Sequence, residues 1–220
     1  MALERVLEPE VMDTYEEARD YDSMDHQAVN KLFVDDLLAA GNIDNDILDV
    51  GTGTAQIPVE LCRQSEDCRI IAIDMAVHML DLARFNIEMD GFTQRIFLQQ
   101  IDAKDMLFES EMFDCVMSNS IIHHIPEPLA VLAESIRVTR PGGLLFFRDL
   151  LRPESGEEVA HLVSTYAGDE NEHQRQMFDD SLRAALSLSE IRAMVSSLGF
   201  EAETVQATSD RHWTWIAIKP

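Results

Sequence analysis

Carboxylates and a pair of histidines stand where several short apolar runs of the chain end. Asp49, Asp74 and Asp149 each come at or near the end of such a run, and His123 and His124 follow another. A carboxylate accepts hydrogen bonds on both of its oxygens, and histidine titrates near neutral pH. These residue types can therefore bind a polar or cationic ligand and can act as general bases.

A glycine-rich turn follows the first of these carboxylates. The apolar residues 47–50 are typical of a buried strand in a parallel sheet, and Gly51 and Gly53 come directly after them. Glycine lets the backbone turn sharply and approach a ligand closely. Residues 56–64 then have a helical pattern that tolerates Pro58 in its first turn. A strand, a glycine turn and a helix in this order form a cradle for a cofactor.

The spacing of this turn separates two classes of cofactor. A dinucleotide fingerprint has glycines at its first, third and sixth positions, which here are Gly51, Gly53 and Gln56. The missing third glycine normally permits close packing of the helix on the strand beneath a pyrophosphate. NAD and FAD are therefore disfavoured relative to a cofactor without a diphosphate. An ordinary tight turn without a ligand stays open as an interpretation.

Residues 49–54, Asp-Val-Gly-Thr-Gly-Thr, closely resemble the first motif of the class I S-adenosylmethionine-dependent methyltransferases. Members often carry a third small residue two positions after the second glycine, and here that residue is Ala55. The resemblance covers residues 45–150 well and the end of the chain loosely. It implies that S-adenosylmethionine is the cofactor and that the turn passes beneath its methionyl part.

The same resemblance implies a cofactor role for residues at several strand ends. Asp49 would contact the methionine amino group, Asp74 the ribose hydroxyls, and Asp102 the adenine amino group. The full set implied is Tyr21, Asp49, Gly51, Thr52, Gly53, Asp74, Met75, Asp102, Ala103 and Asn119. An aspartate at a strand end also serves as a helix N-cap, and this structural interpretation stays open above all for Asp102.

Residues 118–125, Ser-Asn-Ser-Ile-Ile-His-His-Ile, resemble the fourth motif of the family in its small-molecule branch with paired histidines. They lack the Asn-Pro-Pro-aromatic form used on exocyclic amines of bases. We therefore predict a small-molecule methyl acceptor, with His123, His124 and Asp149 as catalytic residues. Either histidine can also be structural, by packing on the sheet or orienting a carbonyl.

A metal site is not indicated by the spacing of its candidate ligands. The available residues are His123, His124, Asp149, His161 and His173, and none shows HExxH or a similar helical spacing. We therefore predict no metal ion, although scattered acids that bind a hard cation stay an alternative.

The composition is strongly acidic, with 41 Asp and Glu against 17 Lys and Arg and a net charge of −24. This charge disfavours nucleic acids and anionic membranes as partners. The chain has no apolar run of about 20 residues and no secretory pattern at its start, and its three cysteines lack a metal-like spacing. We expect a cytoplasmic protein with reduced thiols; its oligomeric state stays open, a homodimer included.

Apolar runs alternate with helical patterns along much of the chain. They predict strands at 47–50, 69–73, 96–100, 113–118, 144–147, 201–207 and 212–218, and helices at 56–64, 77–90, 127–138 and 188–198. The turn 140–143 is expected to precede the fifth strand. This order is typical of an α/β fold: a doubly wound, Rossmann-like seven-stranded sheet with helices on both faces, mostly parallel with an antiparallel C-terminal hairpin.

We predict a single domain over residues 1–220 with two candidate lid elements. One is an N-terminal helical cap, 1–44, in which Asp25 is expected to cap a helix that ends near Gly41. The other is a helical insertion, 152–182, which is longer than a usual connection.

The function predicted from these features is methyl transfer by in-line displacement, achieved mainly through positioning and desolvation. Two alternatives stay open. One is a non-catalytic cofactor-binding module that acts through a partner protein, and the other is an NAD-dependent oxidoreductase.

Overall fold

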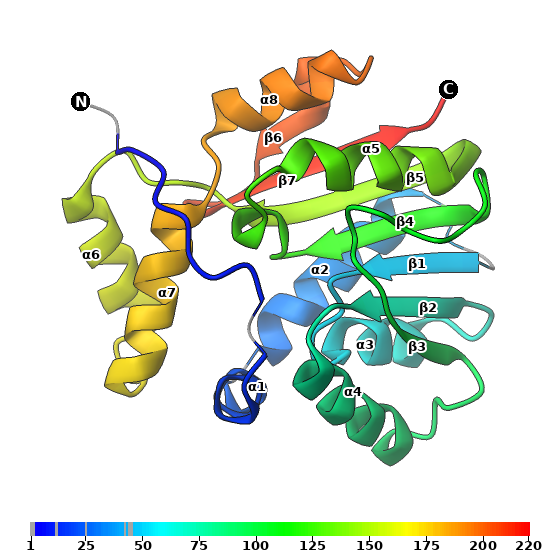
Figure 1. Ribbon diagram of the computed structural model, residues 1–220, viewed down its shortest axis with the longest axis horizontal. Coiled ribbons are helices and arrows are strands. Elements are labelled where there is room, and N and C mark those ends of the chain that lie inside the picture. The colour runs from blue at the N-terminus through cyan, green and yellow to red at the C-terminus, as the bar shows by residue number, and fades with distance from the viewer. Residues whose placement is uncertain (1–2, 12, 25, 42, 44–45) are drawn as a thin grey trace. The chain divides into compact units, whose positions relative to one another are not determined.

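A computed structural model of the chain describes residues 3–11, 13–24, 26–41, 43 and 46–220 (Figure 1). It contains a seven-stranded sheet with the strand order β3-β2-β1-β4-β5-β7-β6. The strands are β1 (Asp46–Val50), β2 (Arg69–Asp74), β3 (Ile96–Gln100), β4 (Phe113–Asn119), β5 (Thr139–Leu150), β6 (Val205–Ala207) and β7 (His212–Ile218). Since β1 pairs in parallel with both β2 and β4, the order reverses at β1, as in a doubly wound fold. β6 and β7 are antiparallel, so the predicted fold class is confirmed.

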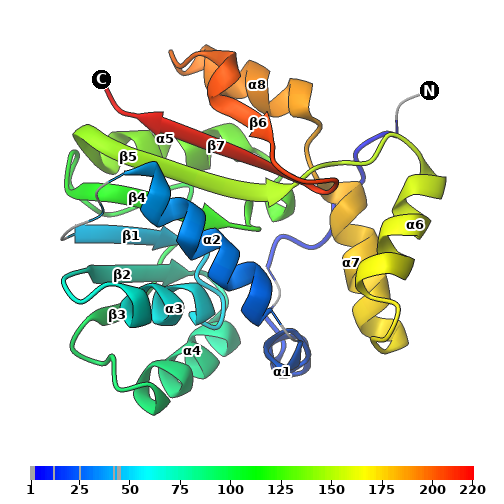
Figure 2. The ribbon, with the colours of Figure 1, turned by 180° about the vertical axis from the view of Figure 1, so that it is seen from behind.

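The helices lie close to the predicted ranges. They are α1 (Tyr15–Ser23), α2 (Gln27–Ala40), α3 (Gln56–Gln64), α4 (Val77–Met89), α5 (Pro128–Val138), α6 (Gly156–Tyr166), α7 (Glu172–Ala184) and α8 (Leu188–Ser197), with short 3-10 turns η1 (Ile122–His124) and η2 (Ala202–Thr204). Figures 1 and 2, which view opposite sides, show α2 and α3 on one face of the β1–β4 strands and α5 on the other. None of these described helices is both long and apolar enough to cross a membrane.

The chain divides into two compact units, which we name by their chemistry. The glycine-turn unit comprises Val11–Asn119, Ala130–Phe147 and Ile216–Pro220. The histidine unit comprises Met1–Glu10, Ser120–Leu129 and Arg148–Trp215. The single domain and the lid roles of 1–44 and 152–182 stay predictions.

Each unit has its own apolar core. In the glycine-turn unit, Ile47 and Ile70 are fully buried on neighbouring strands, and the rings of Phe33 and Phe146 meet edge to face at 5.0 Å. Near-continuous apolar strands of this kind are expected when both faces of a parallel sheet are covered. In the histidine unit, the buried side chains of Leu150, Val159, Leu162, Leu182 and Ala185 form a separate cluster.

Strand β5 is the largest departure from the predicted elements. The expected turn at 140–143 lies within the strand, which begins at Thr139 rather than at 144. The reason is pairing with the distant chain end: Gly142 N donates to Lys219 O at 2.7 Å, and Lys219 N donates to Gly143 O at 2.9 Å. Gly142, with φ 78°, supplies the left-handed backbone that this irregular segment needs.

The start of α2 is a second difference. The predicted N-cap, Asp25, lies outside the described residues. The helix begins at Gln27, its N-cap is His26, and it ends at Ala40 with Gly41 as C-cap.

Candidate active site

The glycine turn is held against the end of β2 by backbone hydrogen bonds. Gly51 N and Thr52 N both donate to Ile73 O at 2.9 Å. Gly51 and Gly53 have φ values of 74° and 53°, so each occupies the left-handed region that glycine adopts at no steric cost. These bonds place the turn beside the last residue of β2, Asp74.

Asp74, at the end of β2, binds the backbone of the glycine turn through its carboxylate. Its Oδ2 accepts a hydrogen bond from Gly53 N at 2.8 Å, and its Oδ1 accepts one from Ala76 N at 2.9 Å. The backbone N–H of Met75 also donates to this carboxylate, so three of its four acceptor positions are engaged and one remains for a ribose hydroxyl. Burial raises the pKa of the Asp74 carboxyl, and the backbone N–H groups that it accepts from oppose this rise.

Asp49 is the second carboxylate at this turn, and unlike Asp74 it is buried. Its side chain is 3% exposed, and burial raises its pKa to about 7, with a lowering contribution from Thr52 and a raising one from the charge of Asp74. No lysine or arginine among the described residues forms an ion pair with either carboxylate. A buried and a half-buried acid without a protein cation suit a positively charged ligand, because such a ligand would supply the missing charge.

Tyr21 of α1 lies over the turn. A Cβ at Gly53 would lie 3.9 Å from the Tyr21 ring, which is ordinary van der Waals contact and places the ring beside the turn. Burial, together with the charges of Asp74, Asp22 and Asp49, raises the pKa of the Tyr21 phenol to about 12. The phenol therefore stays protonated and can donate a hydrogen bond.

Residues that follow β3 lie beside Asp74 through the hydrogen bond from Ile101 N to Asp74 O at 3.1 Å. Asp102 Oδ1 accepts from Lys104 N at 2.9 Å and lies 3.0 Å from Lys104 Nζ. Although burial raises the pKa of Asp102, these two Lys104 contacts lower it overall. These contacts give Asp102 a structural role in holding Lys104, while its contact with the adenine amino group stays a prediction.

The remaining predicted cofactor residues belong to the same unit. Met75, directly after β2, is 41% exposed, Ala103 is buried, and Asn119 is the last residue of β4. The glycine-turn unit therefore contains every residue of the predicted cofactor set.

A polar network that links α1 to the turn was missed by sequence reasoning. Asp22 Oδ1 accepts from both Gln56 Nε2 and Asn86 Nδ2 at 3.0 Å, and Asn86 Nδ2 also donates to Thr54 O at 3.0 Å. Gln56 Oε1 in turn accepts from Asn30 Nδ2 at 3.0 Å. The residue that replaces the third glycine of a dinucleotide site thus ties the N-terminal helices to the glycine turn.

Replacing Asp22 by alanine is expected to lower the free energy of unfolding by about 1–3 kcal/mol, because two amide donors lose their acceptor. The amide hydrogens of α1 should also exchange faster, since the helix loses its link to the turn. Urea unfolding and hydrogen exchange of residues 15–23 measure the two effects. Glu16→Ala, an exposed change on the same helix, is the control and should change neither; equal effects in both variants would contradict the network.

In the histidine unit, Asp149 organises the turn η1 that carries both histidines. Its carboxylate is 1% exposed; Oδ2 accepts from Ile122 N at 2.5 Å, and Oδ1 accepts from Leu150 N at 2.6 Å. Oδ1 also lies 2.5 Å from His123 Nδ1. Both oxygens are thus engaged within the unit, an arrangement that positions His123. The predicted catalytic role of Asp149 is not tested by these contacts.

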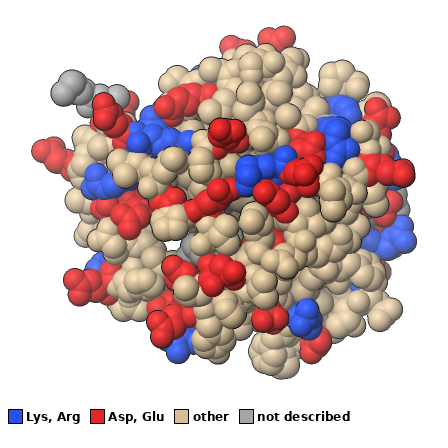
Figure 3. Space-filling view, in the orientation of Figure 1, with Lys and Arg blue, Asp and Glu red and all other residues tan. Residues whose placement is uncertain are grey.

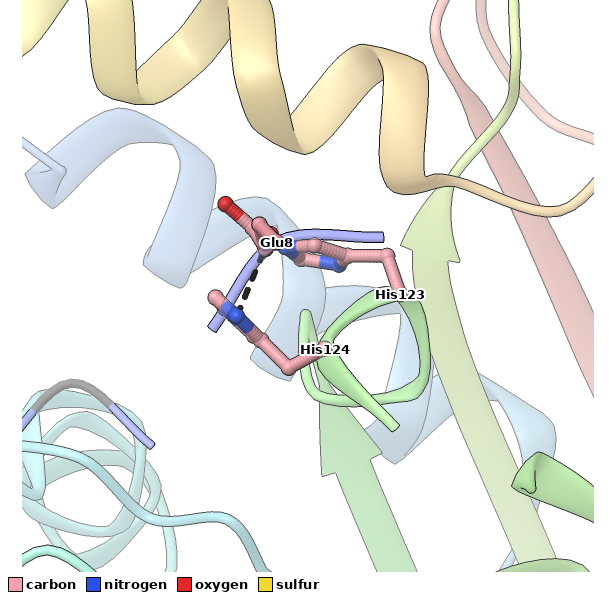
Figure 4. Close-up of side chains that lie close together, drawn as sticks. All are labelled: Glu8, His123 and His124. Carbon is pink, nitrogen blue, oxygen red and sulfur yellow. Dashed lines mark ion pairs between the residues drawn. The ribbon is translucent and has the colours of Figure 1, made fainter. Parts of the chain in front are cut away.

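Glu8 joins the two histidines, and sequence reasoning missed it. Glu8 Oε1 lies 3.1 Å from His124 Nδ1 and 3.6 Å from His123 Nε2 (Figure 4). Burial raises the pKa of Glu8, while His123 opposes the rise. No pattern near residue 8 signals this role, because the histidines come more than a hundred residues later.

The two histidines have opposite electrostatic settings. Burial acts to lower the pKa of His123, but the nearby carboxylates of Asp149 and Glu8 raise it above its usual value. Burial, together with the neighbouring His123, lowers the pKa of His124 to about 3. His124 is therefore neutral at physiological pH.

A doubly wound sheet with a glycine turn after β1 and a carboxylate after β2 defines the Rossmann-like class of cofactor-binding domains. Residues 48–147 match the family described as "Methyltransferase domain". The chain is 27% identical over 117 residues to a ubiquinone biosynthesis O-methyltransferase of Histophilus somni, covering 52% of this chain and 48% of that protein. It is 35% identical over 97 residues to a phosphatidylethanolamine N-methyltransferase of Cereibacter sphaeroides, covering 44% of this chain and 46% of that protein.

A solved structure shares the fold over nearly the whole chain. A SAM-dependent methyltransferase from Aquifex aeolicus superposes with a TM-score of 0.69 at 18% identity, covering 94% of this chain and 99% of that one. The match over residues 48–147 and the methyltransferase relatives agree with the predicted class I S-adenosylmethionine-dependent family and with S-adenosylmethionine as the cofactor. The chain spans about half the length of the two curated relatives.

Proposed function

We propose that this chain transfers the methyl group of S-adenosylmethionine to a small-molecule acceptor. The observation that carries the proposal is a pair of carboxylates at the glycine turn, the buried Asp49 and the half-buried Asp74, with which no lysine or arginine among the described residues forms an ion pair. S-adenosylmethionine has an ammonium group, a sulfonium and a ribose diol, which match a cation-seeking site with free carboxylate lone pairs.

The cofactor supplies the reactive methyl group, so the protein has little covalent chemistry to do. Asp74 and Gly53 form the cradle for the ribose, and Asp49 faces the ammonium group. The Tyr21 ring lies beside Gly53, where it would contact a bound cofactor. Holding acceptor and methyl in line contributes to the rate by removing orientational freedom, and excluding water strengthens each electrostatic contact.

The class of acceptor rests on three further observations. The two named relatives act, by their names, on an oxygen in ubiquinone biosynthesis and on the amine of phosphatidylethanolamine. The net charge of −24, with acidic side chains spread over the face in Figure 3, opposes binding of nucleic acids. The segment 118–125 has the paired-histidine form.

The proposal is tested in two stages with the full chain. Calorimetric titration with S-adenosylhomocysteine and with NADH should give micromolar binding of the former only. Transfer of a labelled methyl group from S-adenosylmethionine to a panel of phenols, amines and thiols should then produce labelled product. Tight S-adenosylhomocysteine binding without transfer to any acceptor would support the non-catalytic module, and binding of NADH alone would support the oxidoreductase.

A further inference from the structure

Three metal-ligating side chains converge in the histidine unit from two distant parts of the chain. The ligand atoms offered by Glu8, His123 and His124 all lie within 4.8 Å of one another. Figure 4 shows the three side chains gathered at one place. We propose that these residues bind a divalent transition-metal ion of the Zn²⁺ class through Glu8 Oε1, His123 Nε2 and His124 Nδ1. This proposal departs from the prediction of no metal and does not depend on methyl transfer.

The measured distances fit ligands that share one ion. Zinc lies about 2.0–2.1 Å from histidine nitrogen and about 2.0–2.2 Å from carboxylate oxygen, so two ligands at a tetrahedral angle are about 3.3 Å apart. Glu8 Oε1 lies 3.1 Å from His124 Nδ1 and 3.6 Å from His123 Nε2, on either side of that value. The third pair, His123 Nε2 and His124 Nδ1, lies within 4.8 Å, so side-chain rotation would complete the convergence of the three ligands on one ion.

Hydrogen bonding at these atoms is incomplete. Glu8 Oε1 and His124 Nδ1 are buried and have no hydrogen-bond partner, although only 3.1 Å separates them. Their mutual geometry thus satisfies neither atom. A buried polar atom without a partner costs free energy, and such atoms are rare in folded proteins. One cation between the lone pairs would satisfy both atoms, which is a second observation that points to a ligand.

The surrounding contacts orient the proposed ligands. Asp149 Oδ1 is 2.5 Å from His123 Nδ1, so Nε2 is the nitrogen that faces Glu8, and a metal ion would bind there in place of a proton. A carboxylate behind a histidine in this way is the usual support for a metal-bound imidazole. Ser181 Oγ donates to Glu8 Oε2 at 3.3 Å and leaves Oε1 for the ion. Arg5 Nη2 donates to His123 O at 3.1 Å, which ties the segment bearing Glu8 to η1.

The donor set indicates the kind of metal. Two imidazoles and one carboxylate are typical of zinc and of non-haem iron, whereas magnesium and calcium prefer oxygen ligands alone. Three protein ligands leave at least one coordination position open to water or another oxygen donor. Of the charged groups that act on His123, Asp149 and Glu8 are negative and Arg5 is positive, and Asp180 adds a further negative charge near Glu8, which favours a divalent cation.

The test uses the full chain, freed of metal with a chelator, and Zn²⁺ and Co²⁺ as probes. The expected result is one Zn²⁺ per chain by calorimetry and a Co²⁺ absorption spectrum typical of nitrogen and oxygen ligands. Glu8→Gln and His124→Ala should each weaken binding by on the order of 100-fold or more, because each removes a ligand. The exposed positions Glu4→Gln and His161→Ala are matched controls and should bind like the unmodified chain.

Several outcomes would overturn the proposal. One is the absence of stoichiometric Zn²⁺ binding, and another is unchanged affinity in a folded Glu8→Gln variant. A sulfur-to-cobalt charge-transfer band would assign the metal instead to Cys62 and Cys68, whose sulfurs are 3.8 Å apart in the other unit. Circular dichroism without metal establishes that each variant folds. If either fails to fold, the Co²⁺ spectrum of the unmodified chain decides the question.

Discussion

Replacing Asp49 by asparagine is expected to stabilise the cofactor-free protein at pH 8 and to weaken its binding of S-adenosylmethionine. The pKa of Asp49 is raised by burial to about 7 in the folded chain from an ordinary value of 3.8. Between these two values the folded state binds more protons than the unfolded state, so the free energy of unfolding falls as pH rises through this window. Above about pH 7, the stability of the folded chain is reduced by the full cost of burying the ionised Asp49 carboxylate.

The size of the effect follows from the same two values. The difference between 3.8 and about 7 corresponds to at most about 4 kcal/mol of lost stability at pH 8. The asparagine side chain carries no charge, so the Asp49→Asn variant should regain about 2–4 kcal/mol at pH 8 and almost nothing near pH 4, where the native carboxyl is already protonated. Urea unfolding of the cofactor-free chains at both pH values measures this.

Cofactor binding should change in the opposite direction. A charge-assisted contact with the cofactor ammonium group disappears in Asp49→Asn, which costs about 1–3 kcal/mol, or about 5- to 150-fold in affinity. In the native chain, affinity should rise with pH through about 7, because Asp49 must be ionised to pair with the ammonium group. In the variant this part of the pH dependence should vanish. Calorimetry with S-adenosylmethionine at pH 6, 7 and 8 measures both effects.

An exposed aspartate of the same unit supplies the control. Asp81 is 58% exposed and lies 3.6 Å from Arg84, so Asp81→Asn should change stability by less than about 0.5 kcal/mol and leave cofactor affinity unaltered. Loss of stability in Asp49→Asn at pH 8 would show that the carboxylate is stabilised by its surroundings, contrary to the expectation. A trade of stability for binding is common where a site holds a charge for its ligand.

The fold was predictable because its signals are local. Runs such as 47–50 and 69–73 are apolar at nearly every position, and the helices between them have their own periodicity and end signals. The start of β5 was not predictable, because Arg140-Pro141-Gly142-Gly143 has the composition of a turn. Only the pairing of Gly142 and Gly143 with Lys219 extends the strand, and that partner lies at the far end of the chain.

The candidate site divides in the same way. The glycine turn and Asp74 were located because each directly follows an apolar strand, and their contact is a consequence of strand pairing. Glu8 and Asp22 have no local signal. Their importance arises from partners in other segments, such as the Asp22–Asn86 bond across 64 residues. Asp149 was located correctly at a strand end, yet only its contacts show that it orients His123.

Removing the Asp74 carboxylate is expected to produce the largest loss of cofactor affinity among substitutions in the turn. Asp74→Ala would remove the acceptor for a ribose hydroxyl and also the partners of Gly53 N and Ala76 N. Loss of the ribose contacts alone costs about 1–3 kcal/mol, and the freed Gly53 N–H loosens the turn further. Calorimetry should show S-adenosylhomocysteine binding weakened by about 5- to 150-fold or more.

A cofactor analogue separates the ribose contact from damage to the turn. S-adenosylhomocysteine that lacks the ribose 2′-hydroxyl should bind the native chain more weakly, but it should bind Asp74→Ala almost as well as the parent compound does. If the two losses were additive instead, the carboxylate would not contact the hydroxyl, since independent sites add and contacting groups do not. Asp81→Ala, on the surface of the same unit, should leave both compounds unaffected. A non-additive cycle would therefore assign Asp74 to the ribose directly, whereas an additive one would restrict it to holding Gly53 in place.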